Sequence, residues 1–235
     1  MLESAKRTPE ILFENEHFIA VDKPAGWLSV FSRMGEKETR PVVGVFLEKK
    51  INKPIFPCHR LDVEVQGVLL YAKTKEAHAL SQKWFENRII VKSYLAITHG
   101  KCQDRWSPDI PRKILKDELD PGKTWTWKTQ MSRGKRRAYE DARGLQAITE
   151  ATFLKQNGDN CFWKLSPLTG RSHQLRLEMA LRGFVIKGDE LYGSTDEHED
   201  GIDLQAWQLN LKNVTEKDRM GLPLIVACQE PLFHV

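Results

Sequence analysis

The amino-acid sequence predicts an α+β fold built on a mixed, largely antiparallel sheet that is flanked by helices and loops. Short strand patterns dominate along the 235 residues, and helical patterns fall between them at irregular intervals. Regular alternation of strands and helices would instead indicate parallel βαβ units. No internal repeat or low-complexity segment is present. A chain of this length can bury one large core, so we expect a single domain over residues 1–235.

The first part of the chain contains three predicted strands and two predicted helices. Apolar residues recur at helical spacing within Lys75–Arg88, and Val42–Lys50 shows a shorter pattern of the same kind. The almost wholly apolar run Gly67–Lys73 indicates a strand that is buried on both faces. Two short strands are expected nearer the N-terminus, at Ile11–Phe13 and Phe18–Val21, before a Pro and a Gly break the pattern.

The second part of the chain is dominated by predicted strands. They are Ile89–Thr98, Ala147–Leu154, Phe162–Pro167, Gln205–Leu211 and Leu222–Cys228. One helix is predicted from His173 to Arg182, ending before Gly183. Residues 104–124 are rich in Pro, Asp and Lys and predict a long connection.

The composition is that of an ordinary globular protein, with 40% hydrophobic and 29% charged residues. No apolar run approaches the roughly 20 residues that a membrane span requires, and the N-terminus lacks the apolar core of a signal peptide. The four cysteines are far apart and form no Cys-x-x-Cys pair, so we expect reduced thiols in a cytoplasmic protein. They are Cys58, Cys102, Cys161 and Cys228.

Positive charge is concentrated between Lys123 and Arg143, although the net charge is only +4. This segment carries seven Lys and Arg residues against two carboxylates, with Trp125, Trp127 and Tyr139 between them. Cations mixed with aromatic rings favour nucleic acid as a partner, and a solvated basic hairpin is the alternative. We interpret residues 104–145 as a basic insertion that contacts RNA. A separate acidic group is expected to form a surface loop away from phosphate: Asp196, Glu197, Glu199, Asp200 and Asp203.

Two clusters of polar side chains are the candidates for a functional site. His59–Asp62 places a carboxylate beside a cation just before the buried strand, where it can be held ionised and directed at a ligand. Gly170–Arg176 supplies a second dense group of hydrogen-bond donors. For either cluster alone, a turn or a surface ion pair is the simpler interpretation. His59 and His173 lack further ligands at metal-binding spacing, so we predict no metal.

Three segments, taken in order, resemble the RluA-type pseudouridine synthases. They are His59–Asp62 with Gly67–Thr74, Val91–Ala96 with Gly100, and Gly170–Arg176 with Gly188–Gly193. Val21–Gly26 also resembles the Lys-Pro-x-Gly element of that family. Val65-Gln66 departs from the Thr-Ser or Val-Ser pair common in the family, which bears on loop packing and substrate fit. The resemblance covers nearly the whole chain and identifies a compact member without an N-terminal S4-type domain.

The resemblance implies a role for each of these side chains. Asp62 would act as the nucleophile, or as the base that starts elimination at the ribose, and Arg171 would pair with it and keep it ionised. Tyr94 would pack against the uracil and accept the proton lost from carbon 5. Leu175 would form the apolar wall opposite, and Arg60 would support the flipped-out state. The other candidate substrate-binding residues are His59, His173, Arg133, Arg136 and Arg137.

The function expected on this basis is an isomerase that converts uridines of ribosomal or transfer RNA to pseudouridine. Breaking the bond to uracil nitrogen and rejoining the base through carbon needs no redox or energy carrier, so we expect no cofactor and no nucleotide. The partner would be structured RNA, with no membrane contact, and the protein would be a monomer. The alternative is a catalytically silent RNA-binding or RNA-folding factor on the same fold. A nucleoside glycosidase is disfavoured because a second carboxylate for activating water is missing.

Overall fold

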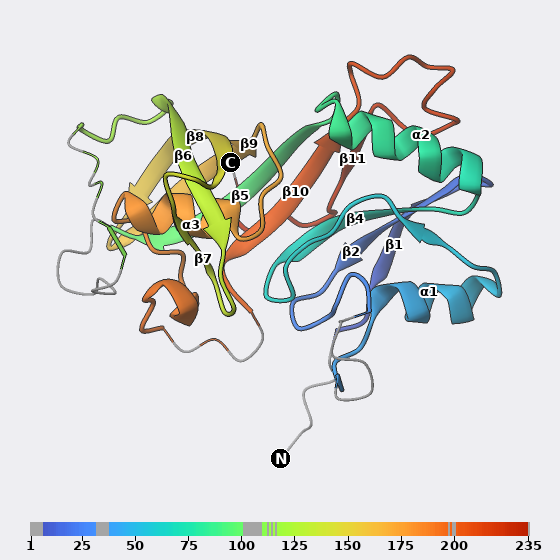
Figure 1. Cartoon of the computed structure of the whole chain (residues 1–235), viewed down its shortest axis with the longest axis horizontal. Coiled ribbons are helices and arrows are strands. Elements are labelled where there is room, and N and C mark those ends of the chain that lie inside the picture. The colour runs from blue at the N-terminus through green and yellow to red at the C-terminus, as the bar shows by residue number, and fades with distance from the viewer. Residues whose placement is uncertain are drawn as a thin grey trace. The chain divides into compact units, whose positions relative to one another are not determined.

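The computed structural model describes residues 7–31, 38–100, 110–111, 113, 115, 117–196, 198 and 201–234. Its elements group into two compact units, Met1–Ile90 with Gln208–Gln229 and Val91–Trp207 with Glu230–Val235. Both units combine strands with helices (Figure 1), which confirms the predicted α+β class. The single domain expected over residues 1–235 stays a prediction. Four residues named above lie outside the described residues: Cys102, Glu197, Glu199 and Asp200.

Three antiparallel strands form the centre of the first unit: β1 (Glu10–Glu14), β2 (Phe18–Lys23) and β4 (Gln66–Ala72). Asn15 forms the turn between the first two, because its Oδ1 accepts hydrogen bonds from two backbone N–H groups that follow it. Every residue of β2 is buried, and so is every residue of β4 after Gln66. The doubly buried strand predicted from the apolar run is therefore confirmed.

Two helices pack against opposite faces of these strands (Figure 1). α1 (Val43–Ile51) and α2 (Lys75–Glu86) lie where helical spacing predicted them. Side chains alternate across a strand, so Phe18 on β2 and Tyr71 on β4 point to different faces of the sheet. Trp84 of α2 packs on Phe18, with ring centroids 5.7 Å apart, while α1 lies on the Tyr71 side.

Short pairings complete the first unit. β3 (Phe56–Pro57) pairs with β4. β11 (Ile225–Ala227) pairs antiparallel with residues 208–210 at the end of β10 (Leu204–Asn210). The expected strand at Leu222–Cys228 is therefore shorter than predicted, because only three of its residues pair with β10.

The second unit contains five antiparallel strands that pair in the order β5, β9, β8, β6 and β7. Their bounds are β5 (Val91–His99), β6 (Thr124–Arg133), β7 (Ala138–Glu140), β8 (Leu145–Asn157) and β9 (Asn160–Pro167). β8 extends beyond its predicted range at both ends. The described part of the long connection before β6 contains no helix or strand, as expected.

β6 was not among the predicted strands, although its pattern is in the sequence. Trp127, Thr129 and Met131 are buried, and the residues between them are exposed, which is the period of two expected for a half-buried strand. Eight consecutive residues of β6 pair with β8. The basic segment is thus a hairpin, β6 and β7, that belongs to the sheet of this unit.

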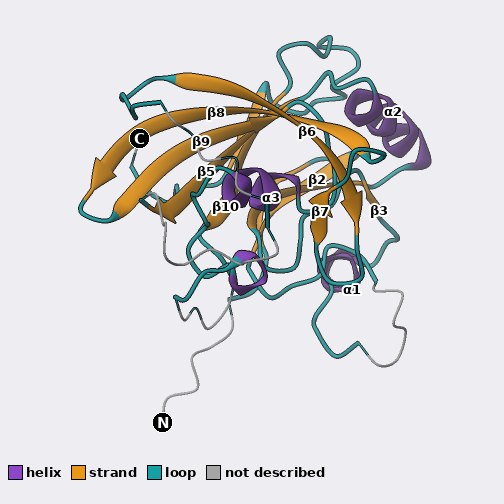
Figure 2. Ribbon diagram, turned by 60° about the vertical axis from the view of Figure 1, so that its left-hand side comes forward, coloured by secondary structure: helices purple, strands orange, loops and turns teal. Residues whose placement is uncertain are grey.

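α3 (Gln174–Leu181) is buried along its whole length and packs against one face of these strands (Figure 2). Leu177 and Leu181 join Met131 and Ala147 of the strands in one apolar cluster. The charged residues of this buried helix require partners. Arg176 binds Asp189 through two hydrogen bonds of 2.7 Å, and Arg182 binds Glu178. No helix among the described residues is long and apolar enough to cross a membrane.

Candidate active site

The loop that carries Asp62 joins β3 to β4, and its backbone is held on both sides of that residue. Ser29 Oγ donates to the Leu61 carbonyl and accepts from the Leu61 N–H, each at 3.0 Å. The Val65 N–H donates to the Asp62 carbonyl at 3.1 Å. Ser29 and Leu61 are buried, whereas Asp62 is half-buried. The backbone at Asp62 therefore has little freedom, although the residue as a whole is only half-buried.

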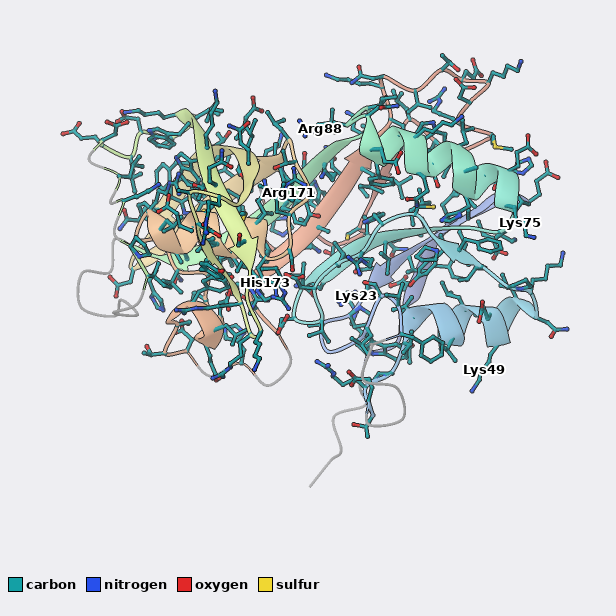
Figure 3. All side chains as sticks on the ribbon, in the orientation of Figure 1. Lys23, Lys49, Lys75, Arg88, Arg171 and His173 are labelled. Atoms are coloured by element: carbon teal, nitrogen blue, oxygen red, sulfur yellow. The ribbon has the colours of Figure 1, made fainter. Side chains whose placement is uncertain are left out.

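A buried lysine also holds the Asp62 loop, through hydrogen bonds to backbone carbonyls. Lys23, at the end of β2 (Figure 3), donates through Nζ to three carbonyls, those of Val63 (3.2 Å), Pro24 (3.0 Å) and Trp27 (2.9 Å). The Val63 carbonyl also accepts from the Gly26 N–H at 2.8 Å. Burial lowers the pKa of Lys23 to about 7, although neighbouring carboxylates including Asp62 act in the opposite direction. The Lys-Pro-x-Gly element thus anchors the residue that follows Asp62.

His59 and Arg60 differ sharply in their surroundings. His59 Nε2 accepts a hydrogen bond from the Leu70 N–H at 3.2 Å, and its ring stacks on Phe85 of α2 with centroids 4.8 Å apart. These contacts hold the start of the Asp62 loop against β4 and α2. Arg60 is exposed, so its guanidinium can reach a large ligand.

In the second unit, the Arg171 loop lies between β9 and α3 and is held by its neighbouring strands (Figure 3). Arg171 Nε donates to the Gln146 carbonyl on β8 at 3.1 Å, and Lys92 Nζ donates to the Thr169 carbonyl at 3.2 Å. Tyr94 is half-buried and lies two residues beyond Lys92 on β5, so both side chains point to the same face of that strand. The structure therefore brings Tyr94 to the side of β5 that supports the Arg171 loop.

Gln174 is the centre of the hydrogen bonds that shape this loop. Its Oε1 accepts from the Arg171 N–H (3.0 Å) and from Thr169 Oγ1 (2.7 Å). Its Nε2 donates to the Ile148 carbonyl (3.0 Å) and to Thr149 Oγ1 (2.9 Å) on β8. The amide is buried and makes four hydrogen bonds, which is the number its atoms allow. Leu175, the next residue, is buried in the first turn of α3.

His173 lies beside this loop in the left-handed backbone region, with φ of 53°. Its Nε2 is 2.9 Å from Nη1 of Arg133, and its Nδ1 is 3.3 Å from the Tyr192 hydroxyl. A guanidinium only donates, so Nε2 accepts and the imidazole carries its proton on Nδ1. His173 is buried and therefore part of the internal structure of the second unit.

Comparison with known proteins identifies the family. Residues 17–181 match the family described as RNA pseudouridylate synthase, a span that contains Asp62, Tyr94 and Arg171. The chain belongs to this family. Membership confirms the predicted enzyme class, an isomerase that acts on uridines in RNA.

Named relatives are similar over most of their length. The tRNA pseudouridine synthase C of Haemophilus influenzae is 35% identical, with 80% of this chain and 77% of that protein covered. The dual-specificity RNA pseudouridine synthase RluA of Vibrio parahaemolyticus is 32% identical, with 86% and 76% covered. The solved structure of human RNA pseudouridylate synthase domain containing 1 shares the fold, with a TM-score of 0.67, 23% identity, and 92% of this chain and 83% of that chain covered.

The basic hairpin of this pseudouridine synthase separates its arginines into two groups. Arg133 at the end of β6 is exposed, and so are Lys135 and Arg136 at the turn between β6 and β7. Arg137 donates to the Leu191 carbonyl at 2.7 Å, and its guanidinium lies 5.7 Å from the Tyr192 ring centroid. Of the three arginines predicted to contact RNA, Arg137 and Arg133 thus have partners within the protein.

The predicted site residues divide between the two units: Asp62, Arg60 and His59 belong to the first, and Tyr94, Arg171 and Leu175 belong to the second. The ion pair expected between Asp62 and Arg171 stays a prediction, because the two residues belong to different units. Sequence reasoning missed Ser29, for which no local pattern points to a contact 32 residues away. Among the described residues, no group of three or more His, Cys, Asp or Glu side chains could hold a metal ion.

Proposed function

We propose that this chain converts specific uridines of transfer RNA to pseudouridine, with Asp62 as the group that attacks or deprotonates the ribose. The observation that carries this proposal is the Asp62 loop, whose backbone is held by Ser29 and Lys23 while Asp62 itself is only half-buried. A preorganised carboxylate is what nucleophilic or general-base chemistry at a bound sugar requires. The choice of transfer RNA rests on the name of the 35% identical relative.

The other site residues have proposed roles around this carboxylate. Arg171 pairs with Asp62 and keeps it ionised during the reaction. Tyr94 packs on the uracil and accepts the carbon 5 proton after the base has turned and rejoined the ribose, and Leu175 forms the apolar wall. Exposed Arg60 occupies the space that the extruded uridine leaves in the RNA. His59 positions the start of the loop through Leu70 and Phe85.

Structured RNA binding is proposed for the hairpin. The exposed cations Lys135 and Arg136 would contact phosphates, and an Arg136→Gln variant should lose affinity with a salt slope lower by about 0.7 to 0.9. An unchanged slope would exclude a phosphate contact at Arg136. We propose that the protein acts as a monomer in the cytoplasm, where its RNA substrates are made.

The activity is tested by incubating the protein with bulk transfer RNA, and separately with ribosomal RNA, from a strain that lacks the protein. Pseudouridine, free uracil and unchanged uridine are then separated by liquid chromatography and quantified by mass spectrometry, and the modified positions are mapped. We expect pseudouridine in transfer RNA and no free uracil. Pseudouridine only in ribosomal RNA would move the substrate to that class, and no product in either would favour the silent RNA-binding alternative.

The role of Asp62 is tested by Asp62→Asn, which should lower the rate by roughly 10³-fold or more while RNA binding is retained. Asp159→Asn is the matched control, because it removes one carboxylate from an exposed turn of the second unit. Full pseudouridine yield from Asp62→Asn would refute the assignment.

A further inference from the structure

The basic hairpin and the Arg171 loop are joined by one chain of hydrogen bonds within the second unit. Arg133, the last residue of β6, donates to His173 Nε2, and the proton on His173 Nδ1 points to the Tyr192 hydroxyl. That hydroxyl donates to the Ala138 carbonyl at 3.2 Å and accepts from the Ala138 N–H at 3.0 Å. His173 is thus tied to β6 through Arg133 and to β7 through Tyr192 and Ala138.

Several contacts hold the members of this chain of hydrogen bonds in place. Tyr192 is buried, and its hydroxyl lies within hydrogen-bond distance of the Ala138 N–H, the Ala138 carbonyl and His173 Nδ1. The guanidinium groups of Arg137 and Arg176 lie 5.7 Å and 5.5 Å from the centre of its ring. Cations over an aromatic face add to the stability of its position. Hydrogen bonds between the buried groups His173 and Tyr192 favour one arrangement of these side chains.

His173 transmits this arrangement to Arg171 because of its place in the chain. It lies two residues after Arg171 and directly before Gln174, whose side chain holds the Arg171 N–H. Its φ of 53° is a conformation that costs free energy in a residue other than Gly and persists only when its surroundings impose it. The contacts with Arg133 and Tyr192 are among those that hold the His173 side chain, and through it this backbone conformation.

We propose that Arg133 and His173 are positioning residues that tie the RNA-binding hairpin to the loop carrying Arg171. RNA held by the exposed residues Lys135 and Arg136 would then also orient the Arg171 guanidinium. This rests on the proposed role of Arg171 at the carboxylate. It changes the expected role of Arg133, which acts on its own protein and not on a phosphate of the substrate.

The test compares the kinetics of Arg133→Met with those of the wild type. The substitution removes the guanidinium donor and keeps the approximate length of the side chain. With saturating RNA, we expect kcat to fall roughly tenfold, the loss expected when one charge-assisted hydrogen bond is removed. His173→Asn should give a similar loss. Asn tolerates positive φ and so preserves the backbone, while the hydrogen bond with Arg133 is lost. A combined variant should lose little more than either single one.

Repeating the Arg133→Met substitution in an Arg171→Lys variant separates a positioning role from a general loss of structure. In Arg171→Lys, which keeps a positive charge, adding Arg133→Met should change kcat less than about twofold, since both changes act through the same group. Losses that multiply would overturn the proposal. So would an unchanged kcat with a raised KM and a lower salt slope, which would make Arg133 a phosphate contact.

The hydrogen bond between Arg133 and His173 can also be observed by a measurement that does not depend on enzyme activity. This separates the present proposal from the proposed function. Nitrogen NMR of the free protein should show His173 protonated on Nδ1 in the wild type, and Arg133→Met should change this signature. If the wild type made no pseudouridine, the proposed function would fail while this measurement still decided whether this hydrogen bond exists. An unaltered His173 signal in Arg133→Met would show that Arg133 does not hold the ring.

Discussion

Replacing Lys23 by Met should change how the stability of this protein depends on pH. Lys23 is fully buried, and its Nζ binds three neutral carbonyls with no carboxylate among its hydrogen-bond partners. Burial therefore lowers its pKa from 10.5 to about 7. Met has a similar length and no titrating group, so the difference between the two proteins isolates the contribution of this amine.

The direction in which the free energy of unfolding changes with pH follows from the number of protons bound in the folded and unfolded states. Between pH 7 and 10.5 the unfolded chain binds a proton at Lys23 that the folded protein lacks, so stability rises with pH in this window. The slope is about 1.4 kcal/mol per pH unit, which gives about 5 kcal/mol over the full window. Below pH 7 the amine is charged in both states, and the dependence disappears.

The assay is urea unfolding of wild type and Lys23→Met at pH 7, 8, 9 and 10. The free energy of unfolding of the wild type should rise relative to the variant by about 4 kcal/mol between pH 7 and 10. Lys49→Met, on the exposed face of α1, is the matched control for removing one lysine from the first unit (Figure 3). Parallel curves for wild type and Lys23→Met would refute the assignment of a buried amine with a lowered pKa.

Three further substitutions test the packing around the site. Ser29→Ala should destabilise the protein by about 2–4 kcal/mol, because the buried N–H and C=O of Leu61 lose their partner, and it should lower kcat by displacing the loop that carries Asp62, the proposed nucleophile; an unfolding midpoint equal to wild type would contradict this. Arg176→Met should cost about 3–5 kcal/mol in urea unfolding, since it leaves the Asp189 carboxylate buried without its guanidinium. Thr74→Ala removes the cap of α2 and should cost about 1 kcal/mol in thermal unfolding, whereas Thr74→Ser should restore it.

Local periodicity predicted most of the secondary structure, and it failed where pairing with a distant strand was decisive. The helices over Val43–Ile51 and Lys75–Glu86 follow from apolar spacing that is visible in the sequence. β6 was not predicted, although its buried residues alternate with exposed ones, because it lies within the segment interpreted as a basic insertion. It is a strand because β8 supplies eight pairing partners some twenty residues later.

The family can be predicted from the linear sequence, and the same motifs predict Asp62, Tyr94 and Arg171 as site residues. The contacts that hold these residues are visible only in the folded protein. Ser29 reaches the backbone beside Asp62 from 32 residues away, and Arg133 reaches His173 from 40 residues away. Such contacts depend on which strands become neighbours after folding, and no local pattern encodes them. The physical reason is that side-chain chemistry is a property of the residue, whereas the position of a side chain is a property of the packed chain.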